Sequence, residues 1–150
     1  MSHTYACLIF HLVWSTKNRL PLITPELQPR LYHYIGGIVR DMNGISISIG
    51  GMPDHIHLLV GLKPTHKPAT IVQNIKRGSS QWINDELLNK RSFHWQEGYG
   101  IFTVAYANKK KTQRYIENQE QHHRKRTFED EWMLILERHG IDYDVKYAFG

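Results

Sequence analysis

Three features that this sequence lacks narrow the class of protein. The chain of 150 residues has a single cysteine, Cys7, which excludes an intrachain disulfide framework and a four-cysteine zinc site. No apolar run approaches the ~20 residues that a membrane span needs, because His11 interrupts the stretch at 6–10. No cationic start precedes that stretch, so no secretory leader is expected. We therefore expect a soluble, cytoplasmic protein with no membrane partner.

Internal repeats and low-complexity segments are also missing, and the Pro and Gly residues stand between periodic runs, as turn residues do. A chain of this length buries roughly two-thirds of the surface that its unfolded form exposes, which is enough for a stable core. We expect residues 1–150 to form one domain.

Charge is distributed unevenly along the chain, whose formal net charge is +5. The segment 109–126 has seven Lys or Arg residues against two acids, whereas 129–150 has six acids against two bases. A concentrated basic segment suits a polyanion site, since phosphate contacts dominate nucleic-acid affinity. The same pattern also fits a solvated helix face, and charge alone leaves both interpretations open.

The hydrophobic pattern predicts an α+β fold. Runs rich in branched and aromatic residues predict four strands, at 5–16, 45–49, 55–62 and 101–106. Apolar residues at three- and four-residue spacing predict two helices, at 24–42 and 69–88. The resulting order is that of a ferredoxin-like βαββαβ core, an antiparallel sheet with two helices on one face. The core pattern leaves the other face of the sheet bare.

Two further helical segments follow this core. The segment 109–125 has almost no apolar residues besides Tyr115 and Ile116, so it is not an ordinary core helix. The segment 128–138 carries enough apolar side chains to dock on the domain, and His139-Gly140 ends it.

The third predicted strand contains a His-x-His pair, His55 and His57. Residues two apart in a strand project to the same face, so the two imidazoles could share a divalent metal. With ten histidines in the chain, about 0.7 such pairs are expected by chance, so the pattern alone also fits two partly exposed strand histidines. The pair faces away from Ile56, Leu58 and Val60, so the core does not need it.

Tyr115 and Gln119 lie one helical turn apart on the charged segment, with His122 next on the same stripe. A surface tyrosine that packs over a neighbour would explain Tyr115. A phenolic oxygen can instead act as a nucleophile when a metal or base makes its deprotonation accessible. Gln119 would then offer a neutral oxygen ligand to the same metal.

Five motifs occur in order along the chain. They are HLVWSTKNR at 11–19, MPDHIHLLV at 52–60, KRGSS at 76–80, WQxxY at 95–99 and YIxxQxxHH at 115–123. Together they resemble the single-tyrosine HUH transposases of the IS200/IS605 type. The resemblance covers nearly the whole chain and is far more specific than the His-x-His pair.

The resemblance implies a ferredoxin-like enzyme that cuts and rejoins single-stranded DNA at hairpin-flanked ends. By motif position, His55 and His57 would bind Mg²⁺ or Mn²⁺ with Gln119 as third ligand. Tyr115 would be the nucleophile and form a 5′-phosphotyrosine link. Because that link conserves the phosphodiester energy, rejoining needs no nucleotide cofactor, and the sequence shows no phosphate-binding loop.

The resemblance also implies a homodimer, in which the tyrosine helix completes its own metal site or that of its partner. Relatives associated with repetitive extragenic palindromes usually carry a glycine-rich signature that is missing before Tyr5. A mobile-element enzyme is therefore the preferred subclass.

Cationic and aromatic side chains near the motifs are candidates for DNA contact. Six of them are expected to bind backbone phosphates: Lys76, Arg77, Lys109, Lys110, Lys111 and Arg114. Trp95 and Tyr99 are candidates for base stacking, although Trp95 equally suits the core.

Two other classes of protein compete with this interpretation. A non-catalytic, domesticated module could bind single-stranded nucleic acid on an open ferredoxin-like sheet, but that needs stacking aromatics that 45–49 and 55–60 lack. A metal-storage or metal-sensing protein would explain the histidines but not Tyr115 or the basic segment.

Overall fold

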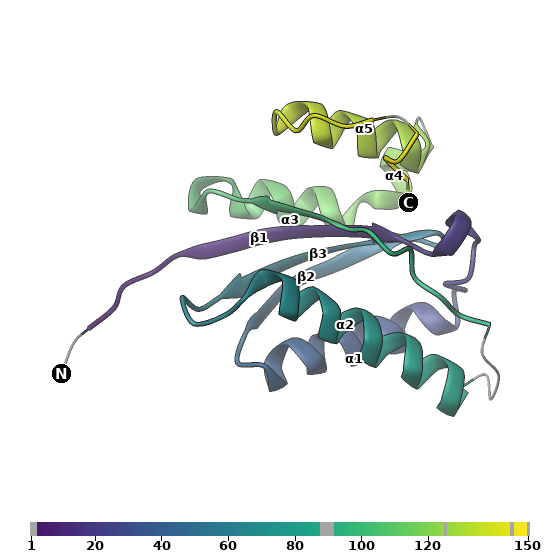
Figure 1. The fold of residues 1–150 in the computed structure, drawn as a ribbon, viewed down its shortest axis with the longest axis horizontal. Helices are drawn as coiled ribbons and strands as arrows, with labels where there is room; N and C mark the ends of the chain where they lie inside the picture. The colour runs from purple at the N-terminus through teal and green to yellow at the C-terminus, as the bar shows by residue number, and fades with distance from the viewer. Residues whose placement is uncertain (1–2, 88–91, 125, 145, 150) are drawn as a thin grey trace.

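The computed structural model describes residues 3–87, 92–124, 126–144 and 146–149. Four strands form one antiparallel sheet in the order β2-β3-β1-β4: β1 (Leu8–Ser15), β2 (Ile45–Met52), β3 (His55–Leu62) and β4 (Gly100–Thr103). Figure 1 shows helices on both faces of this sheet. The α+β class, with an antiparallel sheet in ferredoxin-like order, is therefore confirmed.

Helices α1 (Leu27–Asp41) and α2 (Pro68–Trp82) cover one face of the sheet. Alternate residues of β1 and β3, such as Leu12 and Leu58, form a core with helix residues such as Ile35 and Ile75, all fully buried. The period-2 pattern of β3 thus turns Ile56, Leu58 and Val60 toward the helices, as the sequence predicts.

Several element boundaries differ from the predicted ones. β1 starts at Leu8, and β4 ends at Thr103. β2 runs past the predicted end at Ile49 through Gly50 and Gly51, which pair with His57 and Ile56, so the turn before β3 is Pro53-Asp54. α2 ends at Trp82 and continues as a π-helical turn at 83–87, and the predicted end at Leu88 lies outside the described residues.

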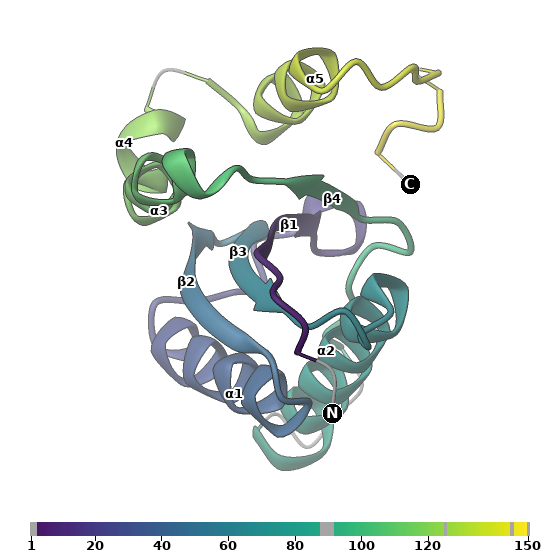
Figure 2. The same ribbon diagram turned by 90° about the vertical axis from the view of Figure 1, so that its left-hand side faces the viewer.

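The second face of the sheet is not bare, so that expectation was wrong. Helices α3 (Lys109–Glu117) and α4 (Gln119–His123) lie over β2 and β3, and α5 (Phe128–Arg138) lies over β1 and β4 (Figure 2). This face carries apolar residues of its own, and Ile116 and Trp132 cover them. Burying them favours helices over an open surface.

The predicted helix 109–125 is two helices, because Asn118 leaves helical geometry between α3 and α4. Lys125 lies outside the described residues. α5 has the predicted bounds, and the Thr127 hydroxyl caps it by accepting from the Asp130 amide at 3.2 Å. Within the described part of the chain, no helix is long and apolar enough to cross a membrane.

Gly50 allows α3 to approach the sheet closely. A Cβ at this position would overlap the carbonyl oxygen of Ile116, which is backbone and cannot turn aside. We expect Gly50→Ala to lower the free energy of unfolding by about 1–3 kcal/mol and to displace the helix that carries Tyr115. Urea unfolding measures the effect. Gly61→Ala is the control, because its Cβ would meet Ile45 at an ordinary 3.5 Å, and an equal loss there would contradict the explanation.

Candidate active site

His55 and His57 project from β3 toward the face that α3, α4 and α5 cover. Both side chains are fully buried, and their ring centroids lie 5.2 Å apart. The alternative of two partly exposed strand histidines is therefore wrong. Buried imidazole nitrogens require hydrogen-bond partners, so the two histidines should have polar neighbours.

The Nδ1 atom of each histidine has such a partner. His55 Nδ1 lies 2.7 Å from Asp54 Oδ1, and His57 Nδ1 lies 2.8 Å from His11 Nε2. Burial and then the nearby His57 lower the pKa of His11 well below its usual value, so His11 is neutral. These contacts fix both rings and direct each Nε2 atom away from the strand, as outer partners do at histidine metal sites.

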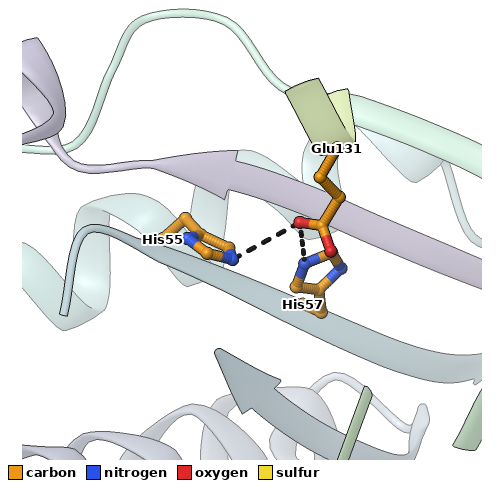
Figure 3. Close-up of side chains that lie close together, drawn as sticks. All are labelled: His55, His57 and Glu131. Atoms are coloured by element: carbon orange, nitrogen blue, oxygen red, sulfur yellow. Dashed lines mark hydrogen bonds and ion pairs between the residues drawn. The ribbon is translucent and has the colours of Figure 1, made fainter. Parts of the chain in front are cut away.

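Both Nε2 atoms face Glu131, which reaches down from α5 (Figure 3). Glu131 Oε1 lies 3.0 Å from His57 Nε2 and 3.5 Å from His55 Nε2, and the residue is 1% exposed. Although burial opposes the charged form, hydrogen bonds from His123 and His57 hold the pKa of Glu131 well below its usual range. One ligand atom from each of His55, His57 and Glu131 lies within 4.8 Å of the others, which makes the cluster a possible metal site.

Gln119 lies beside this cluster. Its Oε1 atom is 3.1 Å from His55 Nε2 and 3.1 Å from His123 Nε2, and the side chain is buried. The structure therefore brings the predicted third ligand to the histidine pair, although Glu131 holds a comparable position. His123, whose Nε2 is 3.3 Å from Glu131 Oε1, completes the polar lining.

Tyr115 is tied to the same carboxylate, because its hydroxyl donates to Glu131 Oε2. The ring is half-buried, stacked at a tilt against His122 with centroids 4.6 Å apart. Burial, followed by the charge of Glu131 and the hydrogen bond to it, raises the pKa of Tyr115. One carboxylate thus connects the candidate nucleophile with the histidine pair, and the alternative of a tyrosine that merely packs over a neighbour does not account for that bond.

Sequence reasoning missed Glu131, His11 and the role of Asp54. Glu131 interrupts an apolar stripe on α5 formed by Phe128, Trp132 and Ile135, at helical spacing. An acid on a stripe that is otherwise buried signals a polar site beneath it.

The candidate DNA contacts fall into two groups. Lys76, Arg77, Trp95 and Tyr99 line one cavity of about 540 Å³ between α2 and the segment 94–99. Trp95 belongs to the core: it is 8% exposed, packs edge-on against Trp14 and donates to Ser79 Oγ at 2.9 Å. Its expected role in base stacking is therefore corrected to packing, whereas Tyr99 is 38% exposed, with Lys76 Nζ 5.8 Å from its ring centroid.

The second group lies on α3. Lys110, Lys111 and Arg114 are exposed, and Lys109 Nζ lies 5.8 Å from the Tyr106 ring centroid. Lys111 lines a hollow that also contains Tyr115, so this group lies beside the candidate nucleophile and the α2 group does not.

Lys76 is held in an unusual environment. Its Nζ donates to the carbonyls of Glu97 and Gly98, at 3.1 and 2.9 Å. Burial lowers its pKa to about 8, although the Glu97 charge opposes this.

Between pH 8 and 10 the unfolded chain therefore binds more protons than the folded one, and stability rises with pH. We expect the free energy of unfolding of the wild type, relative to Lys76→Met, to increase across this window. Urea titrations with exposed Lys63→Met as control measure it, and parallel curves for the wild type and Lys76→Met would contradict the prediction.

Comparisons with known proteins agree with this geometry. Residues 4–119 match the family model described as transposase IS200 like. The ISDra2 transposase TnpA of Deinococcus radiodurans is 29% identical over 118 residues, which cover 75% of this chain and 84% of the relative. The chain belongs to the IS200-like transposase family.

Two solved structures of transposases have the same fold. A candidate transposase from Deinococcus radiodurans superimposes with a TM-score of 0.63 at 26% identity, covering 79% of this chain and 96% of its own. A REP-associated tyrosine transposase bound to a REP hairpin gives a TM-score of 0.60 at 18% identity, covering 82% of this chain and 74% of its own. The family match ends at residue 119, so α5 and Glu131 lie beyond it.

Proposed function

We propose that this protein cleaves and rejoins single-stranded DNA at hairpin-flanked ends, with Tyr115 as nucleophile and a divalent metal bound beside it. The observation that carries the proposal is the contact of one carboxylate, Glu131, with both the Tyr115 hydroxyl and the His57 ring. Family membership supports the DNA chemistry.

The residues at the cluster fit a hard or borderline divalent cation. His55 and His57 each offer an Nε2 atom, while their Nδ1 atoms are held by Asp54 and His11, and Glu131 offers a carboxylate oxygen. Gln119 Oε1 is within reach as a further neutral donor. Nitrogen and oxygen donors without thiolate suit Mn²⁺ or Mg²⁺. When bound, such an ion would polarise the scissile phosphate and offset the charge of Glu131.

Tyr115 supplies the attacking oxygen, and the step conserves protons. The Tyr115 oxygen forms a bond to phosphorus while the bond from phosphorus to the 3′ oxygen breaks, which leaves a 5′-phosphotyrosine and a free 3′-hydroxyl. The reaction moves one proton from the phenol to the 3′ oxygen. Glu131 Oε2 accepts the hydrogen bond from the phenol and thereby orients the attacking oxygen, while solvent takes up the phenol proton and supplies one to the 3′ oxygen. Rejoining reverses these steps with another 3′-hydroxyl.

A non-catalytic module that binds nucleic acid on an open sheet is a weaker candidate. Helices α3, α4 and α5 cover the face that such a module would use, and the buried contacts of Glu131 have no role in it. Lys76, Arg77 and Tyr99 remain candidates for DNA contact on the α2 side, as do Lys109, Lys110, Lys111 and Arg114 on α3. A homodimer and a cytoplasmic location remain predictions.

Covalent adduct formation tests the proposal. The protein is incubated with a pool of labelled single strands that carry a hairpin and randomised flanks, with Mn²⁺, Mg²⁺ or EDTA. We expect a labelled protein band on denaturing gels with either metal and none with EDTA. No adduct with any strand or metal, from protein that is folded by circular dichroism, would refute the catalytic proposal.

A further inference from the structure

The C-terminal part of the chain places two arginines beside Tyr115. Two hollows adjoin the tyrosine, of about 620 and 360 Å³, and Tyr115, Arg126 and Arg138 line both of them. Arg124 lines the larger hollow and Lys111 the smaller. We call the two hollows together the tyrosine trough. Figure 2 shows the elements beside it, with α3 and α4 on one side and α5 on the other.

Positive charge dominates the tyrosine trough. Glu131 is its one acid among the described residues, and Glu131 is engaged by His57 and Tyr115. Within the part of the chain that the structure describes, no carboxylate lies within ion-pair distance of Arg126 or Arg138. The two guanidinium groups are therefore available to a ligand.

The acidic character of the C-terminal segment does not cancel this charge. Glu129 pairs with Arg19 Nε at 2.8 Å, and Glu137 accepts from the Tyr143 hydroxyl at 3.2 Å. Arg138 nevertheless lines the tyrosine trough from the last turn of the same helix. α5 thus contributes one cation, Arg138, to the tyrosine trough although its other charged residues are acids.

Arg126 lies close enough to influence the tyrosine oxygen. Arg126 and Tyr115 line both hollows of the tyrosine trough together. A cation in this place stabilises negative charge at the attacking oxygen and on a phosphate beside it.

We propose that Arg126 and Arg138 bind the backbone phosphates next to the scissile bond of a single DNA strand. This inference rests on the proposed function and names residues that the family match, which ends at residue 119, does not include. Guanidinium groups suit phosphate because they can donate two parallel hydrogen bonds. The segment after the matched region is then part of the DNA site.

Salt-dependent binding tests the inference. The Arg126→Gln/Arg138→Gln double variant and the wild type are titrated, without metal, against fluorescein-labelled dT25 at several KCl concentrations, by anisotropy. We expect the double variant to bind about tenfold more weakly, and the slope of log K against log salt to shrink by about 0.7 for each lost contact. Lys63→Gln/Arg40→Gln is the charge-matched control, because both residues are exposed at the end of the sheet remote from His55.

Each outcome supports or overturns the inference. An unchanged slope in the double variant, or an equal change in the control, overturns it. A change in sedimentation behaviour without a change in slope assigns the tyrosine trough to subunit contact instead and overturns it as well. The Mn²⁺ affinity of the double variant, measured by calorimetry, should stay within twofold of that of the wild type. A variant whose active site had unfolded would lose this affinity. If the wild type forms no adduct but the slope still falls, the catalytic proposal fails and the phosphate contacts stand.

Discussion

Replacing Tyr115 with phenylalanine should abolish the covalent DNA adduct. The change removes only the hydroxyl that donates to Glu131 and leaves a ring that can still stack against His122. Because no other group would replace the attacking oxygen, we expect adduct formation to fall by more than about 10³-fold. Denaturing electrophoresis of labelled strands measures the adduct, and anisotropy measures binding, which should change less than threefold.

Tyr106→Phe is the matched control for this prediction. Tyr106 precedes α3 and is 72% exposed, so the same loss of a hydroxyl there should leave the adduct unchanged. An adduct that survives in Tyr115→Phe would remove Tyr115 from the nucleophile role and leave it a packing residue.

Replacing Glu131 with glutamine should weaken metal binding by about 100-fold or more. Glutamine keeps the shape of the side chain but removes the charge that lies 3.0 Å from His57 Nε2. Loss of an outer partner alone costs 10–100-fold in metal affinity, and a charged ligand contributes at least as much. Isothermal titration with Mn²⁺ measures the affinity, and cleavage should fall in parallel.

His57→Ala should also abolish cleavage while leaving hairpin binding nearly intact.

Glu129→Gln provides the control on the same helix, since Glu129 pairs with Arg19 at the surface. Its metal affinity should equal that of the wild type. A Glu131→Gln variant that binds Mn²⁺ more tightly, or cleaves faster, would contradict the ligand role. Glu131 would then be a residue that occupies the site and blocks it.

The fold could be predicted because its determinants are local. The alternation in β3 and the helical spacing in α1 and α2 are each contained within one element, and Ile56 and Leu58 lie on the predicted face. The expectation of a bare second face was wrong because α5 and α3 cover it, and the charged sequence of α3 conceals its one fully buried side chain, Ile116.

The site could be predicted only in part for a related reason. His55, His57, Gln119 and Tyr115 belong to short motifs, and the structure brings all four to one place. Glu131 belongs to no such motif, and its contact with His57 spans 74 positions of sequence. The packing of α5 on Phe102 and Val13, which lie far away in sequence, brings Glu131 to that contact.

The position of Glu131 in α5 also affects the order in which the site is completed during protein synthesis. A chain is made from its N-terminus at about 5–20 residues per second, and early segments can fold before later ones exist. A nascent chain that ends before α5 contains the strands, the histidines and the tyrosine, but lacks the carboxylate that connects them. Under the proposed function, translation must therefore pass residue 131 before the site is complete.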